Sequence, residues 1–241
     1  MVKITALFLQ RRRRDRLSEQ EKQALEAAVA EVRVLPARHV MVRQGETVTR
    51  STLLVEGLMC RYMDGRDGQR QLVALHVPGD FVDLHAFPLE QLDHDVATIS
   101  RAKVATFPRE TLLALTRDHP HLVRMLWFST LLDAAMHREW IFRLGRLGAT
   151  GRVAHFFCEM NVRLAMVGLS SGNRFHLPVT QSDIAEACGL TSVHVNRVLR
   201  QLRDSGQLEF QRGEARVLDW EALKATGEFD DAYLYVDGTP D

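Results

Sequence analysis

Hydrophobic and polar positions follow two different periods along the 241-residue chain. From about Val32 to Pro108, short apolar segments such as STLLVEG and QLVALHV are separated by glycine turns such as RQGE and VPGD. Strands with this spacing form compact barrels or jelly rolls, because glycine tolerates the positive φ of tight turns. The region therefore predicts a β-roll. A helix is predicted before it in SEQEKQALEAAVAEV, with Ser18 as N-cap and Glu21 three residues later.

After Pro108 the apolar period lengthens from two residues toward 3.6. Pro120 suits the first turn of a helix, and the positions that follow form one stripe at three- and four-residue steps. Such a stripe fits a helix packed in the core of one chain and equally a helix paired with its copy in a dimer, and its spacing alone does not separate the two. The stripe consists of Leu122, Met125, Ser129, Leu132, Met136, Trp140 and Leu144.

Glycines gathered in residues 145–151 mark the main boundary in the chain. Beyond it we expect a helix in RVAHFFCEMNVRLAMVGL, two short helices, a hairpin in LEFQRGEARVLD and a short terminal helix. The predicted fold class is α+β. The expected domains are an N-terminal helix with a double-stranded β-helix or jelly roll (1–117), a long helix (118–146) and a C-terminal winged helix-turn-helix (147–241).

The two short helices lie in TQSDIAEACGLTSVHVNRVLRQL, residues 180–202. Thr180 is expected to cap the first helix, with Asp183 returning the bond, and Thr191 is expected to cap the second. Gly189 permits the sharp turn between them. The second helix, expected over residues 191–204, has an apolar face formed by Val195, Val198, Leu199 and Leu202.

The opposite edge of this second helix suits the major groove of double-stranded DNA, which admits a helix and displays base-edge donors and acceptors. Arg197 fits guanine, Asn196 fits adenine or a phosphate, and Val193 fits a thymine methyl group. The capped first helix, the glycine turn and the following hairpin favour a winged helix-turn-helix over a merely solvated polar face. The candidate DNA-binding residues are Thr180, Gln181, Ser192, Val193, Asn196, Arg197 and Arg200.

Composition and charge narrow the classes of function. Lys plus Arg and Asp plus Glu both number 31, so the formal net charge is zero and DNA binding has to use a local patch. No apolar run approaches the roughly 20 residues of a membrane span. Cys60, Cys158 and Cys188 form no CxxC pair, so a disulfide framework and a cysteine-rich metal site are not expected. The simplest interpretation is a cytoplasmic protein with reduced thiols.

These motifs together resemble the Crp/Fnr family of transcription regulators over nearly the whole chain. The VEG and PGDF segments match the cyclic-nucleotide-binding-type β-roll of that family, and the helix from Pro120 through Leu144 matches its dimerisation helix. LGATGR, residues 147–152, matches the start of its DNA-binding domain. The resemblance implies a homodimer that binds a palindromic operator, places two recognition helices about 34 Å apart and contacts RNA polymerase.

Two departures from the family pattern bear on operator sequence and sensing. Val193 occupies the position where the family usually has a base-reading glutamate, and valine cannot accept a hydrogen bond from a cytosine amine. Where the family holds the phosphate of cyclic AMP with an Arg-Ser pair, the stretch 82–100 contains no arginine, and Asp95 would repel the phosphate. Control by cyclic AMP is therefore not expected. The candidate effector-pocket residues are His85, His94, Asp95, His137 and Arg138.

No cofactor, catalytic residue or metal site is predicted. The N-terminal cysteine set that holds an iron–sulfur cluster in oxygen-sensing relatives is absent, whereas His76, His85 and His94 around the expected pocket keep haem or a metal ion as a further option. A ligand-independent DNA binder with the β-roll as scaffold is one alternative to an unidentified small effector. Another is an enzyme using His85, His94 and nearby aspartates such as Asp83, although no matched nucleophile or metal triad supports it.

Overall fold

The computed structural model describes residues 3–237, and the chain divides into two compact units. The first unit contains the chain up to Met63, residues 74–134 and the end of the chain from Asp237. The second contains residues 64–73 and 135–236. The long helix α4 (Pro120–Arg146) contributes residues to both units. Among the described residues, none of the helices is long and apolar enough to cross a membrane.

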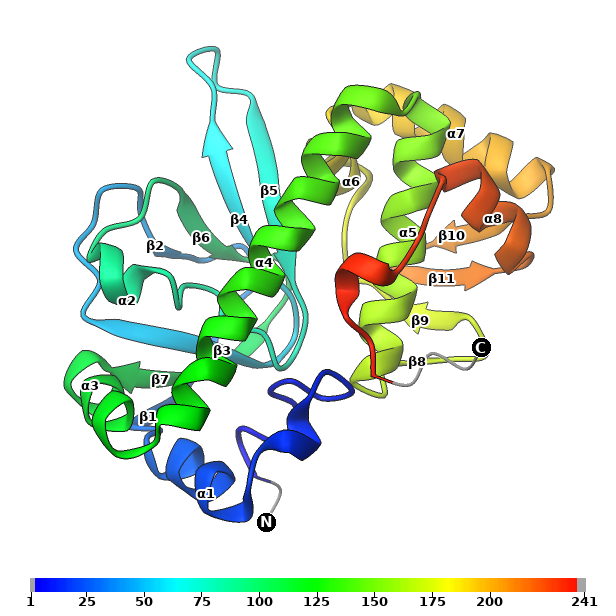
Figure 1. Ribbon diagram of the computed structural model, residues 1–241. Coiled ribbons are helices and arrows are strands. Elements are labelled where there is room, and N and C mark those ends of the chain that lie inside the picture. The colour runs from blue at the N-terminus through cyan, green and yellow to red at the C-terminus, as the bar shows by residue number, and fades with distance from the viewer. Residues whose placement is uncertain (1–2, 238–241) are drawn as a thin grey trace. The chain divides into compact units, whose positions relative to one another are not determined.

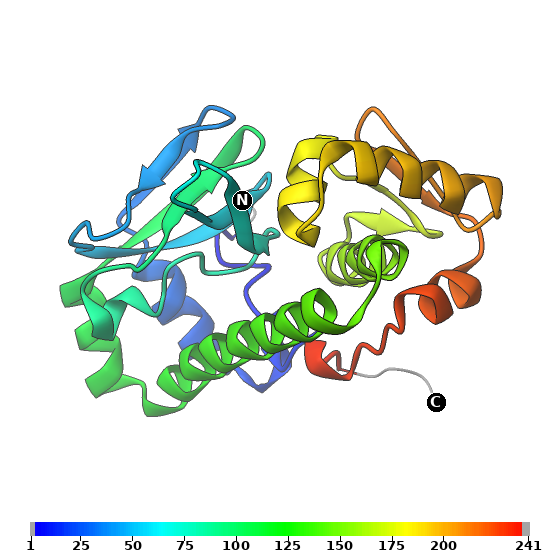
Figure 2. The same cartoon turned by 90° about the horizontal axis from the view of Figure 1, so that it is seen from above.

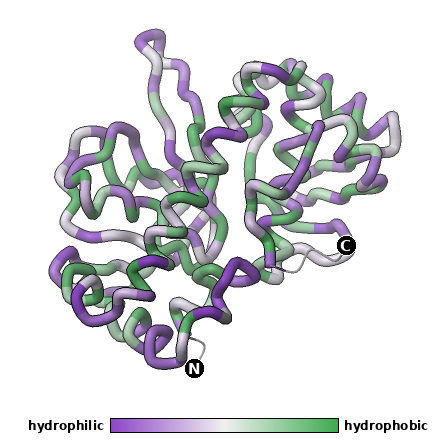
Figure 3. Tube along the Cα trace, viewed as in Figure 1, coloured by the Kyte–Doolittle hydropathy of each residue, from purple (hydrophilic) through white to green (hydrophobic). Residues whose placement is uncertain are grey.

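Antiparallel strands form the body of the first unit (Figure 1). One sheet has the order β1-β7-β3 and the other the order β2-β6-β4-β5. The turn between β4 and β5, DGRDGQ, is hydrophilic (Figure 3), as expected for an exposed connection. The strands are β1 (Glu31–Leu35), β2 (Val40–Val42), β3 (Arg50–Glu56), β4 (Met59–Asp64), β5 (Arg70–His76), β6 (Asp95–Thr98) and β7 (Ala102–Pro108).

Three helices accompany these strands: α1 (Glu19–Ala27), α2 (Ala86–Leu89) and α3 (Arg109–Asp118). The predicted capping box is present at the start of α1, where the Ser18 hydroxyl accepts from the Glu21 amide and the Glu21 carboxylate accepts from the Ser18 amide. Leu25, Phe107 and Leu122 belong to one hydrophobic cluster, which joins α1, β7 and the start of α4. The helices are therefore held by burial of apolar side chains in addition to their caps.

The second unit contains a helix-turn-helix and a four-stranded antiparallel sheet of order β10-β11-β9-β8. The predicted hairpin is confirmed as β10 and β11, with positive φ at Arg212 and Gly213 in its turn. Strands β8 and β9 were not predicted, because they are only two and three residues long. The elements are α5 (Ala149–Met166), β8 (Ser170–Ser171), β9 (Arg174–His176), α6 (Gln181–Cys188), α7 (Ser192–Asp204), β10 (Leu208–Gln211), β11 (Glu214–Val217) and α8 (Trp220–Gly227).

Most of the stripe that the sequence showed on α4 is buried within a single chain, and only Ser129 and Leu144 are half-buried. Leu122, Leu132 and Trp140 are all nearly inaccessible to solvent. Of the two interpretations left open for these residues, packing in the core of one chain is the one that the structure supports. Any pairing of α4 with a second copy has to use a different face of the helix.

Candidate nucleic-acid interface

Local rules fix the start of α6 and the turn into α7. The Thr180 hydroxyl accepts a 3.2 Å bond from the Asp183 amide, and Asp183 Oδ2 accepts a 2.6 Å bond from the Thr180 amide. Gly189 ends α6 in the left-handed region at φ 60°, which a side chain would disfavour. The Thr191 hydroxyl then caps α7 by accepting from the His194 amide at 3.3 Å. These caps and the turn are as predicted.

Helix α7 buries the predicted apolar face and leaves its opposite edge in solvent (Figure 2 shows α6 and α7 together on one side of α5). Val193 is 70% exposed, although burial would be favourable for a valine. Among the described residues, neither Arg197 nor Arg200 forms an ion pair with a carboxylate, so both guanidinium groups are available to an outside anion. An exposed apolar residue beside two free arginines is suited to a groove that presents methyl groups, base acceptors and phosphates.

Some of the candidate DNA-binding residues contact one another, and others already form hydrogen bonds within the protein. The Asn196 side-chain amide donates to the Gln181 carbonyl oxygen at 3.4 Å, which joins the starts of the two helices. The Thr180 hydroxyl is already used in the capping box, so its role is structural at this point. His194 was missed by sequence reasoning. It is exposed in the first turn of α7 and lies 3.1 Å from the Thr191 hydroxyl.

Two of the candidate effector residues lie together in the first unit. His85, just before α2, and His94, just before β6, lie together with their ring centroids 5.2 Å apart. Asp95 is held elsewhere, because its Oδ1 accepts a 2.6 Å bond from the Gln44 amide. His137 and Arg138 belong to the second unit, whereas both paired histidines belong to the first.

A buried ion pair beside these histidines was missed by sequence reasoning. Arg61 on β4 is only 2% exposed, and its NH1 donates to Asp133 Oδ2 of α4 at 2.5 Å. Its Nε donates to the Val82 carbonyl oxygen at 2.7 Å. The signal was an arginine in the middle of the strand MCRYM, where the flanking residues are apolar. The pair ties a strand of the β-roll to the first half of α4.

Comparison with known proteins agrees with this architecture. Residues 32–119 match the family described as "Cyclic nucleotide-binding domain", and residues 151–226 match the family described as "Crp-like helix-turn-helix domain". The protein belongs to the Crp/Fnr family. The predicted α+β fold, with a β-roll, a long helix and a C-terminal helix-turn-helix, is confirmed. Members of this family are transcription regulators rather than enzymes.

Two curated relatives and one solved structure show how far the likeness of this Crp/Fnr regulator extends. "Transcriptional activator protein FnrA" of Stutzerimonas stutzeri is 26% identical over 203 residues, which are 84% of this chain and 83% of the relative. "Nitrogen fixation regulation protein FixK" of Bradyrhizobium diazoefficiens is 29% identical over 190 residues, 76% and 78% of the two chains. The structure of FixK2 from Bradyrhizobium japonicum aligns with a TM-score of 0.75 at 26% identity, covering 82% of this chain and 97% of that one.

Both paired histidines of this Crp/Fnr regulator are uncharged at neutral pH. Burial, reinforced by the positive charge of Arg61, lowers the pKa of His85 to about 3 and lowers the pKa of His94 as well. His94 Nδ1 donates to Asp93 Oδ1 at 2.7 Å, since a carboxylate only accepts. Within the described part of the chain no group of three or more metal-ligating side chains was found. The neutral pair therefore offers hydrogen bonds rather than charge.

Asp83 is buried near the same ion pair and supplies a pH-dependent contribution to stability. Burial raises the pKa of Asp83 to about 7, although its Oδ1 accepts a 2.5 Å bond from the Thr52 amide. An unfolded aspartate titrates near about 4, so the folded protein holds this proton more tightly. The contribution of Asp83 to stability is therefore largest below about pH 4 and is lost as the pH rises through about 7.

Replacing Asp83 with asparagine is expected to remove this pH dependence. The Asp83→Asn variant should gain about 1 to 3 kcal/mol of unfolding free energy relative to wild type between pH 5 and pH 8, because it has no buried carboxyl to ionise. Urea unfolding at four pH values measures the difference. Glu110→Gln, a change at an exposed carboxylate on α3, is the control and should show no such trend. A difference that stays constant with pH would contradict the assignment.

Proposed function

We propose that the protein is a homodimeric transcription regulator that binds a palindromic operator through α7, and that cyclic AMP does not control it. The observation that carries the proposal is the exposed edge of α7. Val193, Arg197 and Arg200 lie on this edge, and among the described residues neither arginine forms an ion pair with a carboxylate. FnrA and FixK, named as an activator and a regulation protein, support the same role. RNA polymerase is the further protein partner in this proposal.

An exposed apolar seam on α4 supports the homodimer. Its members repeat at alternating steps of four and three residues, as the contact positions of a coiled coil do. Trp127, Leu131 and Ile141 are 63%, 53% and 71% exposed, and apolar surface of this extent favours a partner that covers it. A two-fold axis along the seam would pair each helix with its copy. The α4 seam consists of Trp127, Leu131, Ala134, Arg138, Ile141 and Gly145.

The sensor chemistry supports independence from cyclic AMP. The stretch 82–100 has no arginine to hold a cyclic phosphate, and the buried Arg61 is already paired with Asp133. His85 and His94 are neutral and so add no positive charge. An anion entering there would have to displace a formed ion pair and would meet the carboxylates of Asp93 and Asp133.

Arg197→Ala is expected to weaken operator binding by about 10- to 100-fold, because a lost bidentate base contact costs about 1 to 3 kcal/mol. The operator is first obtained by selection from a random DNA pool, which should yield a two-fold motif. Titrations with the selected duplex at one fixed salt concentration then measure the affinity. Cyclic AMP should leave the wild-type affinity unchanged.

Arg203→Ala is the matched control for this substitution. Arg203 is an exposed arginine in the last turn of the same helix, where it lies 3.5 Å from Asp204. Its removal changes the net charge by the same amount but should cost less than about threefold, which is the scale of one exposed charge at a distance. Equal losses for the two variants would show that Arg197 contributes only general charge.

A further inference from the structure

A cavity in the first unit lies between the α2 segment, α3 and the first half of α4. It holds about 300 Å³, which is at the lower end of the range for small-molecule sites. No charged side chain lines it, so it suits an uncharged occupant rather than a nucleotide. Its lining residues are Leu84, His85, Phe87, Pro88, Leu112, Thr116, Val123, Leu126, Trp127 and Thr130.

The polar groups of the cavity determine which hydrogen bonds a ligand could form there. The Thr116 hydroxyl donates to the Leu113 carbonyl oxygen at 2.7 Å, and the Thr130 hydroxyl donates to the Trp127 carbonyl oxygen at 2.8 Å. Both hydroxyl protons are therefore used within the helices. Within residues 3–237 the imidazole of His85 forms no hydrogen bond, so its nitrogens remain available.

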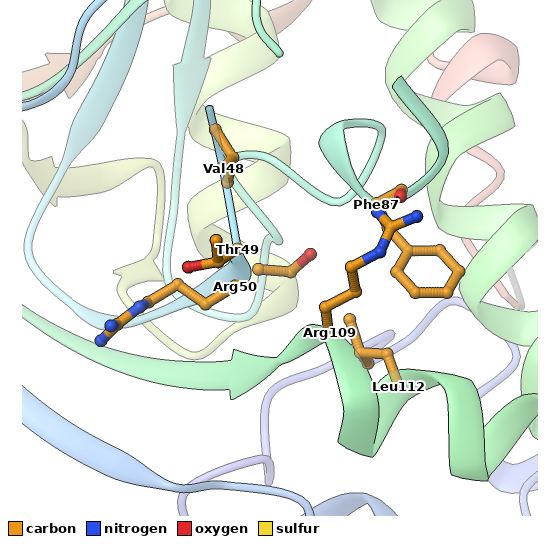
Figure 4. Close-up of a pocket in the computed structure, with 7 residues that line it drawn as sticks. Val48, Thr49, Arg50, Phe87, Arg109 and Leu112 are labelled. Carbon is orange, nitrogen blue, oxygen red and sulfur yellow. Dashed lines mark hydrogen bonds between the residues drawn. The ribbon is translucent and has the colours of Figure 1, made fainter. Parts of the chain in front are cut away.

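One wall of the cavity is held from behind by Arg109, the first residue of α3. Figure 4 shows its side chain reaching Phe87, where its NH1 donates to the Phe87 carbonyl oxygen. Its NH2 donates to Glu90 Oε1 at 2.9 Å, and the guanidinium lies 5.3 Å from the centre of the Phe87 ring. These contacts fix the α2 segment to α3 at Phe87, which also lines the cavity. A wall pinned in this way favours a site that exists before a ligand arrives.

Through His85 the cavity also lies near the ion pair that connects the β-roll to α4. The rings of His85 and His94 lie tilted against each other with their centroids 5.2 Å apart, and both histidines are affected by the charges of Arg61 and Asp133. On α4, Thr130 lines the cavity one turn before Asp133, and Trp127 belongs both to the cavity and to the α4 seam. An occupant would thus contact the helix surface that the proposed dimer uses.

We propose that this cavity binds a small, uncharged, largely apolar molecule of about the size of a fused bicyclic ring, with one hydrogen-bond donor directed at His85. The imidazole accepts that bond through its unprotonated nitrogen, and Phe87, Leu112, Leu126 and Trp127 enclose the rings. The regulatory consequence rests on the proposed function, in that occupancy would alter the packing of α4 and so the affinity for the operator.

Three probes built on the same kind of fused bicyclic ring test the site by calorimetry on the full chain without DNA. Indole has one N–H donor, benzothiophene has the same shape without it, and indole-3-carboxylate adds a negative charge. Indole is expected to bind about 3- to 10-fold more tightly than benzothiophene, the worth of one net hydrogen bond. Indole-3-carboxylate should bind at least about 10-fold more weakly than indole, because the cavity offers its charge no partner.

Substitutions assign the binding to this cavity. His85→Phe should remove the advantage of indole over benzothiophene while retaining both rings. Thr116→Trp places a large side chain at the exposed edge of the cavity and should abolish binding, whereas Leu113→Trp, at an exposed α3 position outside the lining, should not. Absence of indole binding, or equal binding by all three variants, overturns the proposal. If the Thr116→Trp variant still binds indole but no longer dimerises, indole binds elsewhere and the cavity is a surface that the partner chain contacts. This result also overturns the proposal.

The regulatory part is measured separately from the site. Saturating indole is expected to change the affinity of wild type for its selected operator by at least about threefold, a coupling at the low end of allosteric effects. Thr116→Trp should show no such change. Indole binding without a change in operator affinity overturns the regulatory consequence and leaves the site. Indole binding by a protein that selects no DNA refutes the proposed function alone.

Discussion

The Leu131→Glu variant is expected to be monomeric and to bind its operator at least about 100-fold more weakly than wild type. Leu131 is the second of the six residues of the α4 seam and is more than half exposed in a single chain, so its replacement leaves the hydrophobic core intact. In a symmetric dimer each introduced carboxylate would meet its own copy in an apolar seam, where a charge is costly. A monomer contacts one half-site, and the loss of linked binding accounts for the size of the effect.

Sedimentation equilibrium measures the mass, and titration of the selected operator measures the affinity. Leu113→Glu makes the same substitution at an exposed α3 position outside the seam, and this control should remain dimeric and bind normally. Circular dichroism should show that both variants are folded. A Leu131→Glu protein that stays dimeric would place the interface on another surface.

Glu159→Ala is expected to lower the unfolding free energy of the second unit by about 3 to 5 kcal/mol, the usual cost of removing one member of a buried charge network. Glu159 on α5 is 1% exposed and accepts from Trp140 Nε1 at 2.9 Å, Arg163 NH1 at 3.0 Å and the Tyr233 hydroxyl at 3.0 Å. Burial alone would raise the pKa of Glu159, but Arg163 and Arg143 outweigh it and hold the pKa below its usual range. The anion therefore neutralises two buried arginines.

Tyr233→Phe provides a graded comparison for this prediction. It removes the hydroxyl that donates to Glu159 and that lies 3.2 Å from His155 Nε2, and it leaves the carboxylate in place, so it should cost only about 1 to 2 kcal/mol. Urea unfolding at pH 7 measures both variants. Equal losses of unfolding free energy for the two variants would mean that the hydrogen bonds of Glu159 stabilise the protein and its charge does not.

The sequence predicted best what depends on neighbouring residues. The capping boxes at Ser18 and Thr180, the left-handed turn at Gly189 and the buried face of α7 all follow from spacings of three or four residues. The glycine-punctuated strands likewise indicated the β-roll without giving its strand order. These rules are local, and the structure satisfies them without help from distant parts of the chain.

Long-range pairing was not predictable in the same way. Arg61 and Asp133 are 72 positions apart, so no local pattern joins them. His94 has an aspartate on either side in the sequence, and the sequence does not show which of them it contacts. Its partner is Asp93, whereas Asp95 is bonded to the Gln44 amide instead. Only the folded chain decides which of two neighbouring carboxylates a side chain meets.

The long helix α4 shows a further limit of reading periodicity. It has two apolar faces, and the more apolar one, the stripe from Leu122 to Leu144, is largely buried in its own chain. The α4 seam has weaker hydropathy because it includes Arg138 and Gly145. The α4 seam can be recognised only in the structure, where Trp127, Leu131 and Ile141 remain exposed although the other apolar face is packed in the core.

The segment after α8 sets the length of the smallest DNA-binding fragment that could fold alone. The matched helix-turn-helix family ends at residue 226, yet Phe229 and Leu234 beyond it are buried. Tyr233 bonds Glu159 through its hydroxyl, and Phe229 lies edge-on to His155 with ring centres 5.1 Å apart. A fragment cut at the family boundary would expose the inner side of α5 to water. Expression of this domain by itself therefore requires the chain to continue through Leu234.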